Sequence, residues 1–420
     1  MTRTLTESAN YKWFVAALLF FTAGLNYGDR TAITAVFPLL RRDLGMSDIA
    51  LGATGTVFLW TYAAVSPFAG YLGDRMSRAR LLTYSLGAWS LVMACSALAT
   101  SATQLLVMRG VLGLAEAAYI PAATALLADH HGPDTRAKAI GIHLAGFSAG
   151  MVGGGSLAGY LGDNFGWRPS FLILGAAGLV LTTICFLFLR DATAPPLQAG
   201  APVERPTSFK DTLLPLLRVP SFIVLTLEVV LSGTVNWVFI NWLPLFFRET
   251  FSLSLAMAGL YGTLWIQGGR VAGVILGGLP SDKAASKASR YRMLIMVICY
   301  AAATPLLINF AWSSNFTILA ASVAGFALLV GMGYVNAQPL LCELLPERSR
   351  STAIGFMNMV SCFVGGGGVL LAGALKSSFG LANAFASLAA IQGFVMLMLL
   401  VTFLTVLPKD LARVQKADSL

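Results

Sequence analysis

The chain has 420 residues, of which 57% are hydrophobic and only 11% are charged. Soluble domains carry about 25% charged residues, so this composition cannot cover a water-exposed surface and excludes a water-soluble protein. The net charge of +9 is not gathered in a basic run interleaved with aromatic residues, which argues against nucleic-acid binding.

The beginning of the chain predicts a retained first helix. Residues 1–13 lead into an apolar stretch that contains Asn26, Asp29 and Arg30 but no small-residue cleavage pattern. A secretory signal would show such a pattern and no charges in its apolar part.

Charge clusters, prolines and glycines divide the chain into twelve predicted membrane-spanning helices. Each has about 20 residues or more, the length that crosses a hydrocarbon core of about 30 Å. The first six are predicted at 11–37, 49–73, 81–100, 103–129, 136–161 and 169–189. The second six are predicted at 219–247, 255–280, 293–311, 316–342, 350–376 and 382–407.

The distribution of Lys and Arg predicts the orientation. When both termini are placed on one face, that face carries 20 of the 28 basic residues, the opposite face carries five, and three lie within spans. Basic residues concentrate on the cytoplasmic side of membrane proteins. Both termini are therefore predicted to be cytoplasmic.

The two halves of the chain resemble each other. Residues 128–142 match residues 342–356 at an offset of 214, which pairs Arg136 with Arg350. The predicted fold class is therefore an all-α membrane protein of two pseudo-symmetric six-helix bundles. The predicted domains are 1–190, a proline-rich cytoplasmic linker at 191–218 with a short interfacial helix, 219–408, and a tail at 409–420.

A smaller repeat appears within the first half. The segment GYLGD occurs at residues 70–74 and again at 159–163. This offset of 89 indicates a three-plus-three substructure, which is common in transporter folds.

The segment GYLGDRMSRAR at 70–80 resembles the signature of the major facilitator superfamily, and GLPSDK at 278–283 is a degraded copy. NYGDRTAITAVFP from Asn26 and RGVLGLAEAAYIP from Arg109 are similar to the anion:cation symporters, which include hexuronate, galactonate and sialic-acid carriers. Spinster-like lipid exporters share much of both motifs. The resemblance implies a proton-coupled symporter of a small organic anion, such as a sugar acid or carboxylate, working by alternating access. The alternative is a spinster-like, proton-linked transporter of lysophospholipid or a related amphiphile.

Ionisable side chains inside hydrocarbon are costly and are functional candidates by default. Asp29 and Arg30 lie on the polar stripe of the first predicted helix. Arg109 and Glu116 are seven residues apart and so share one face of the fourth predicted helix. These residues form either a fixed ion-pair network or a site where a carboxylate alternates between a proton and an Arg partner. The resemblance implies that Asp29 and Glu116 bind protons and that Arg30 and Arg109 are charge partners or anion ligands.

Further polar residues are candidates for the binding cavity. His143 either relays protons or is a hydrogen-bonded interior group, and Glu228 either lines the cavity or pairs with Arg270. The substrate-binding candidates are Arg30, Arg109, Asn26, Tyr27, Tyr62, His143, Asn236, Gln267, Arg270, Gln338 and Asn358.

The signature segment predicts a cytoplasmic gate, in which Asp74 would interact with the N-terminal end of the eleventh helix, near Arg350. The gate candidates are Gly70, Gly73, Asp74, Arg75, Arg78, Asp282 and Arg350.

Enzyme chemistry is not predicted, because the chain shows no nucleophile triad, metal-ligand cluster or phosphate-binding glycine loop. The five cysteines are scattered and have no C-x-x-C spacing, so neither a disulfide framework nor a zinc site is expected. No cofactor is expected. The predicted partners are protons, membrane lipids and a small anionic substrate or amphiphile. We expect a monomer in the plasma membrane, of the bacterial inner-membrane type.

Overall fold

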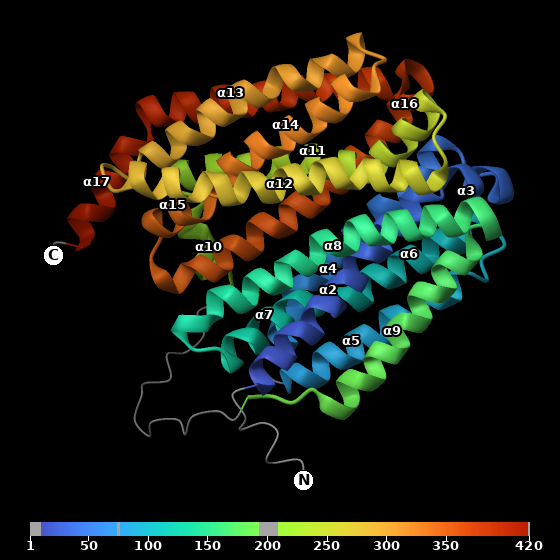
Figure 1. Ribbon diagram of the computed structural model, residues 1–420. Coiled ribbons are helices and arrows are strands. Elements are labelled where there is room, and N and C mark those ends of the chain that lie inside the picture. Colours follow the sequence, from blue (N-terminus) through green and yellow to red (C-terminus); the bar gives the residue numbers. More distant parts are fainter. Residues whose placement is uncertain (1–9, 74–75, 193–208, 419–420) are drawn as a thin grey trace. The chain divides into compact units, whose positions relative to one another are not determined.

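The structure is a computed structural model that describes residues 10–73, 76–192 and 209–418. Side chains at 69–73, 133, 209–212, 347–348 and 414–418 are outside the description. All regular elements in the described ranges are helices (Figure 1). The chain divides into two compact units: Met1–Glu204 with Phe247–Thr263, and Arg205–Phe246 with Leu264–Leu420.

The first unit contains eight complete helices over its described residues. Serine caps explain where two of them begin, because Ser77 accepts a hydrogen bond from the Arg80 amide and Ser101 accepts one from the Gln104 amide. Their bounds are α2 (Tyr11–Ala35), α3 (Phe37–Leu44), α4 (Asp48–Gly73), α5 (Arg78–Ser96), α6 (Ala102–Glu116), α7 (Tyr119–His130), α8 (Pro133–Phe165) and α9 (Arg168–Phe188).

The remaining helices are α10 (Phe209–Leu216), α11 (Pro220–Phe251), α12 (Leu255–Ala285), α13 (Tyr291–Trp312), α14 (Phe316–Tyr334), α15 (Ala337–Leu344), α16 (Glu347–Thr405) and α17 (Leu407–Asp418). The α16 segment bends sharply at Gly380, whose φ of 74° suits glycine, so it consists of two helical arms. Helices α11 and α12 are each divided between the two units, because residues 247–263 belong to the first unit and the rest of both helices to the second.

Eight helical segments among the described residues are long and apolar enough to cross a membrane. One of them, Ser349–Thr405, includes both arms of α16. Helices α2, α5 and α12 have 25, 19 and 31 residues and are not among the eight. The count of twelve spans and the cytoplasmic position of the termini stay predictions.

Helices α2 and α8 lie side by side and pack through glycine (Figure 1). A Cβ atom at Gly150 or Gly154 would overlap the backbone of Gly24 or Gly28, respectively. We call this contact the glycine seam. The Thr31 hydroxyl closes it by donating to the Met151 carbonyl oxygen at 2.9 Å. The seam holds the middle of α2 in a defined position.

Asp163 near the end of α8 caps the beginning of α12. Its two carboxylate oxygens accept hydrogen bonds from the amides of Leu255 and Ala256, each at 3.0 Å. The first amides of a helix have no partner within the helix and favour a negative charge. One carboxylate therefore fastens the first turn of α12 to the first unit.

Candidate functional site

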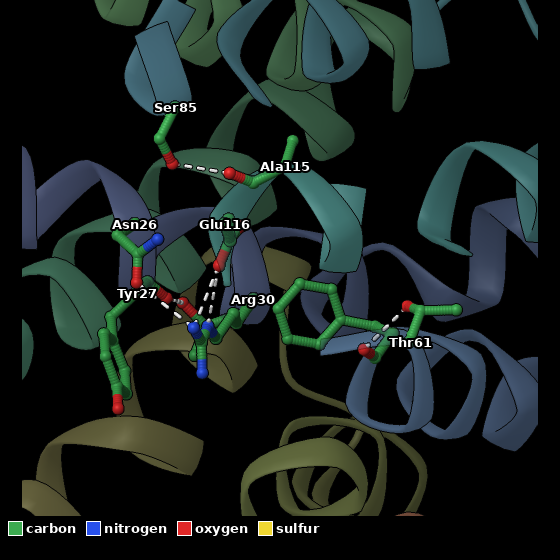
Figure 2. Close-up of polar contacts among 9 residues, drawn as sticks. Asn26, Tyr27, Arg30, Thr61, Ser85, Ala115 and Glu116 are labelled. Carbon is green, nitrogen blue, oxygen red and sulfur yellow. Dashed lines mark hydrogen bonds and ion pairs between the residues drawn. The ribbon is translucent and has the colours of Figure 1, made fainter. Parts of the chain in front are cut away.

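Arg30 of α2 and Glu116, the last residue of α6, form a buried ion pair (Figure 2). Arg30 donates to Glu116 Oε2 from Nε at 3.2 Å and from Nη2 at 2.9 Å. Nη2 also lies 3.2 Å from Oδ1 of Asn26, one helical turn earlier. Arg30 is 5% exposed and Glu116 is fully buried.

Three aromatic rings surround the Arg30 guanidinium. Its central carbon lies 4.4 Å from the ring centroid of Tyr27, 4.8 Å from that of Phe58 and 5.3 Å from that of Tyr62. A guanidinium over an aromatic face gains electrostatic attraction, more so when water is excluded. The rings of α2 and α4 thus help to hold a positive charge inside the bundle.

Arg109 of α6 contacts the same Phe58 ring, at 4.8 Å. Its Nε donates to the Thr54 carbonyl oxygen at 3.3 Å, and its Nη1 is buried without a hydrogen-bond partner. Gly113 explains how α6 approaches α4 here, because a Cβ at this position would overlap Thr61 and the Phe58 carbonyl. Arg109 is therefore buried with unused hydrogen-bonding capacity.

Asp29 completes a group of four charges that we call the charged cluster: Asp29, Arg30, Arg109 and Glu116. Asp29 is 2% exposed, and its Oδ1 has no hydrogen-bond partner. The charges that act on it are those of the other three members. Glu116 Oε1 is also buried without a partner. The cluster thus contains one tight ion pair and, beside it, a carboxylate and a guanidinium with unbonded atoms.

His143 of α8 lies in the same unit, next to the aromatic residues and not bonded to the charged cluster. Its Nδ1 lies 3.1 Å from the Leu19 carbonyl oxygen, which makes Nδ1 the donor. Its ring is 4.8 Å from that of Phe147, which is 4.4 Å from that of Tyr27. This geometry agrees with a hydrogen-bonded interior histidine.

The candidates in the second unit form separate contacts. Arg270 Nη1 donates to Asn236 Oδ1 at 3.2 Å, and its guanidinium carbon lies 5.1 Å from the Tyr334 ring. Glu228 accepts a hydrogen bond from Tyr300 Oη at 2.5 Å. This differs from the alternative in which Glu228 pairs with Arg270, because each residue has another hydrogen-bond partner.

The amide candidates of the second unit differ in burial. Gln267 of α12 is 6% exposed, and its Nε2 has no partner. Gln338 of α15 and Asn358 of α16 are both exposed. Their roles in a binding cavity stay predictions.

The predicted gate is only partly described. Asp74 and Arg75 lie outside the described residues, and Gly70 and Gly73 lie in the last turns of α4, where side chains are not described. Asp282 pairs with Arg292 at 3.0 Å. The gate role of these residues stays a prediction.

The contacts of the gate region repeat between the two halves. Arg78 pairs with Asp129 in the first half. The equivalent residues at the offset of 214, Arg292 and Glu343, also form an ion pair. Likewise, Arg136 Nε donates to the carbonyl of residue 131 and Arg350 Nε donates to that of residue 345, each at 3.2 Å. The sequence repeat therefore corresponds to a repeat of side-chain contacts.

Two residues that contact the charges are not among the candidates that the sequence indicates. Phe58 touches both Arg30 and Arg109, and Tyr300 donates to Glu228. Both lie in apolar stretches, where an aromatic residue by itself indicates only packing. No group of three or more potential metal ligands occurs in the described ranges.

A protein-family model named Major Facilitator Superfamily matches residues 19–284. The chain belongs to the Major Facilitator Superfamily. The resemblance seen in the signature segments is thereby confirmed, and the chain is a multi-pass membrane protein of a family of transporters, not of enzymes.

The chain is similar to members of both predicted branches. It is 29% identical to human protein spinster homolog 1 over 240 residues, which cover 55% of this chain and 45% of that protein, so it spans about half of that relative. It is 23% identical to the hexuronate transporter of Bacillus subtilis (strain 168) over 381 residues, 87% of this chain and 88% of that protein.

A solved structure shows the same fold. It is the inward-facing, unoccupied crystal structure of a bacterial homolog to the human lysosomal transporter Spinster. The TM-score is 0.80 at 22% sequence identity, and the match covers 97% of this chain and 99% of that chain.

Proposed function

We propose that this major facilitator protein is a proton-coupled symporter of a small organic anion such as a sugar acid or carboxylate. The observation that carries the proposal is the unequal pairing in the charged cluster. Arg30 and Glu116 bind each other tightly, whereas Asp29 Oδ1 and Arg109 Nη1 are buried and unbonded. An unused acceptor and an unused donor in one site are what a proton and an anion require.

Charge balance explains why the two ligands would move together. With all four members ionised, the cluster has no net charge. An anion on Arg109 adds one negative charge, and a proton on Asp29 removes one, so the loaded cluster is again neutral. Because uncompensated charge inside a membrane protein is costly, the carrier would change conformation with both ligands or with neither.

The similarity to a hexuronate transporter supports the choice of anion, because a hexuronate carries a carboxylate. Arginine donates two parallel hydrogen bonds to a carboxylate and stays charged. Arg109 suits this role better than Arg30, whose guanidinium already binds Glu116 and Asn26. The twelve spans, the cytoplasmic termini and the bacterial plasma membrane location belong to this proposal.

The similarity to spinster proteins favours a second candidate, a proton-linked transporter of lysophospholipid or a related amphiphile. The buried aromatic rings beside both arginines also suit an amphiphile with a charged head group. This candidate keeps Asp29 as the proton site and differs in the ligand of Arg109.

The test is uptake of radiolabelled D-glucuronate into proteoliposomes with an outside-acid pH gradient. We expect saturable accumulation that a protonophore abolishes. Asp29→Asn should lose gradient-driven accumulation but retain exchange of internal for external D-glucuronate. Asp43→Asn, which changes an exposed carboxylate paired with Arg42, is the matched control and should behave as wild type.

Two outcomes would contradict the first candidate. D-glucuronate uptake that does not depend on the pH gradient would exclude proton coupling. Absence of D-glucuronate uptake together with pH-driven movement of a fluorescent lysophospholipid would favour the amphiphile.

A further inference from the structure

A second buried carboxylate, Glu228 of α11, lies outside the charged cluster and in the other compact unit. It is fully buried. Oε1 accepts the hydrogen bond from Tyr300, and Oε2 is buried without a partner. Glu228 forms no ion pair in the described part of the chain. An isolated carboxylate in this position is strongly unfavourable unless a proton or a cation neutralises it.

Polar groups from α11, α12 and α13 act on Glu228. On α11, Ser232 and Asn236 follow at intervals of one turn and share its face, and the Ser232 side chain acts on both Glu228 and Tyr300. Helix α13 contributes Tyr300, and helix α12 contributes Arg270, whose charge acts on Glu228. Helix α14 contributes Tyr334, which lies under the Arg270 guanidinium and acts electrostatically on Tyr300.

The guanidinium whose charge acts on Glu228 is hydrogen bonded to another residue. Arg270 donates to the neutral amide of Asn236 at 3.2 Å. An arginine close enough to influence a buried carboxylate would be expected to bind it if it were ionised, because a charged acceptor gives a stronger hydrogen bond than an amide oxygen. The arrangement is therefore that of a carboxylic acid, with one oxygen accepting from Tyr300.

We propose that Glu228 is a second proton-binding site, which exchanges its proton for Arg270 during the transport cycle. In the arrangement described here Oε2 carries the proton, and Arg270 is held by Asn236 and Tyr334. On deprotonation the proton passes to water, and Arg270 moves from Asn236 to the Glu228 carboxylate. No other bond is made or broken. This inference rests on the proposed proton coupling and extends it from one bundle to both.

The first experiment needs no substrate. Infrared difference spectra of the full-length purified protein, recorded over a pH titration, report each carboxylic acid through its C=O band. We expect Glu228→Gln to remove one titrating band and Tyr300→Phe to shift the same band, because a hydrogen bond to it is lost. Asp29→Asn should leave this band in place. Glu249→Gln, in an exposed pair with Arg41, is the matched control.

Spectra of Glu228→Gln that match wild type at every pH would overturn the inference. If that variant does not fold, Tyr300→Phe decides: a titrating band that does not shift would also overturn it. Neither result depends on which substrate the protein carries.

The second experiment measures how many protons are transported with each D-glucuronate in proteoliposomes. The ratio is obtained from the pH gradient at which net D-glucuronate flux stops. We expect Glu228→Gln to lower this ratio by one proton and still accumulate substrate, whereas Asp29→Asn accumulates none. An unchanged ratio in Glu228→Gln would overturn the inference. Wild-type uptake that ignores the pH gradient would instead overturn the proposed function.

Discussion

Arg30 directs two of its nitrogens, Nε and Nη2, to a single oxygen of Glu116, at 3.2 Å and 2.9 Å. The other Glu116 oxygen is buried without a partner. The pair neutralises two of the four charges of the cluster. Asp29 precedes Arg30 by one residue and so points about 100° away around the helix. Asp29 takes no part in this pair, and its Oδ1 is buried without a hydrogen-bond partner.

Removing the charge of Glu116 should destabilise the protein strongly. Glu116→Gln leaves the buried Arg30 without its counter-charge, and breaking a buried pair in this way costs about 3–5 kcal/mol. We expect a large fall in Tm, measured by intrinsic fluorescence in detergent. The control Glu249→Gln opens an exposed pair, with an expected effect of about 0–1 kcal/mol. Equal Tm values for the two variants would show that the buried pair does not stabilise the fold.

Arg109 should determine anion affinity. Arg109→Gln removes a charge-assisted partner worth about 1.5–3 kcal/mol, so the Kd for D-glucuronate should rise by about tenfold or more. Isothermal titration calorimetry measures this directly. Asp29→Asn should bind with an affinity closer to that of wild type, since it keeps the guanidinium. Wild-type affinity in Arg109→Gln would exclude Arg109 as the anion ligand.

The glycine seam gives a matched pair of variants in one helix. Gly150→Ala places a Cβ into the backbone of Gly24, and overpacking of this kind costs about 1–3 kcal/mol. Gly153→Ala adds a Cβ where nothing lies within 4 Å, and alanine favours helix by about 1 kcal/mol over glycine. Thermal unfolding should show a lower Tm for the first variant and an unchanged or higher Tm for the second. The reverse order would disprove the close approach of α2 and α8.

Acidification should weaken the connection between α7 and α8. Burial lowers the pKa of His131, which hydrogen bonds through Nε2 to the Lys12 carbonyl oxygen at 3.0 Å. Since the unfolded chain then binds a proton more readily than the folded one, stability should fall as the pH drops through the unfolded value of about 6.5.

The measurement for His131 is Tm as a function of pH. The decrease should be smaller in His131→Gln than in wild type, while the control His130→Gln should follow wild type. Identical pH profiles for His131→Gln and wild type would mean that His131 does not contribute.

The helices and the charged cluster could largely be predicted from the sequence, whereas the exact partners could not. Asp29, Arg30, Arg109 and Glu116 stand out because ionisable residues are rare in apolar stretches, and helical spacing places them on two faces. Phe58 and Tyr300 carry no such signal, since each is one aromatic among many. The pairing of Glu228 depends on how α11, α12 and α13 pack, which no local pattern encodes.

The repeat shows a second limit of prediction. Matching Arg136 with Arg350 identified equivalent positions, and the structure places equivalent contacts there. The offset does not say which atoms meet, because that depends on side-chain conformation. The sequence does not indicate the ion pairs of Arg78 and Arg292, which the structure shows.

The boundary between the two compact units lies inside helices α11 and α12. Asp163 anchors the first turn of α12 to α8, while both helices continue into the second unit. The boundary between the two units falls at residues 246–247 in α11 and at residues 263–264 in α12. Pro244 lies within α11 beside the first of these points and lacks the amide that would stiffen it. The gap that Pro244 leaves in the amide ladder of α11 thus lies two residues before the boundary between the two compact units.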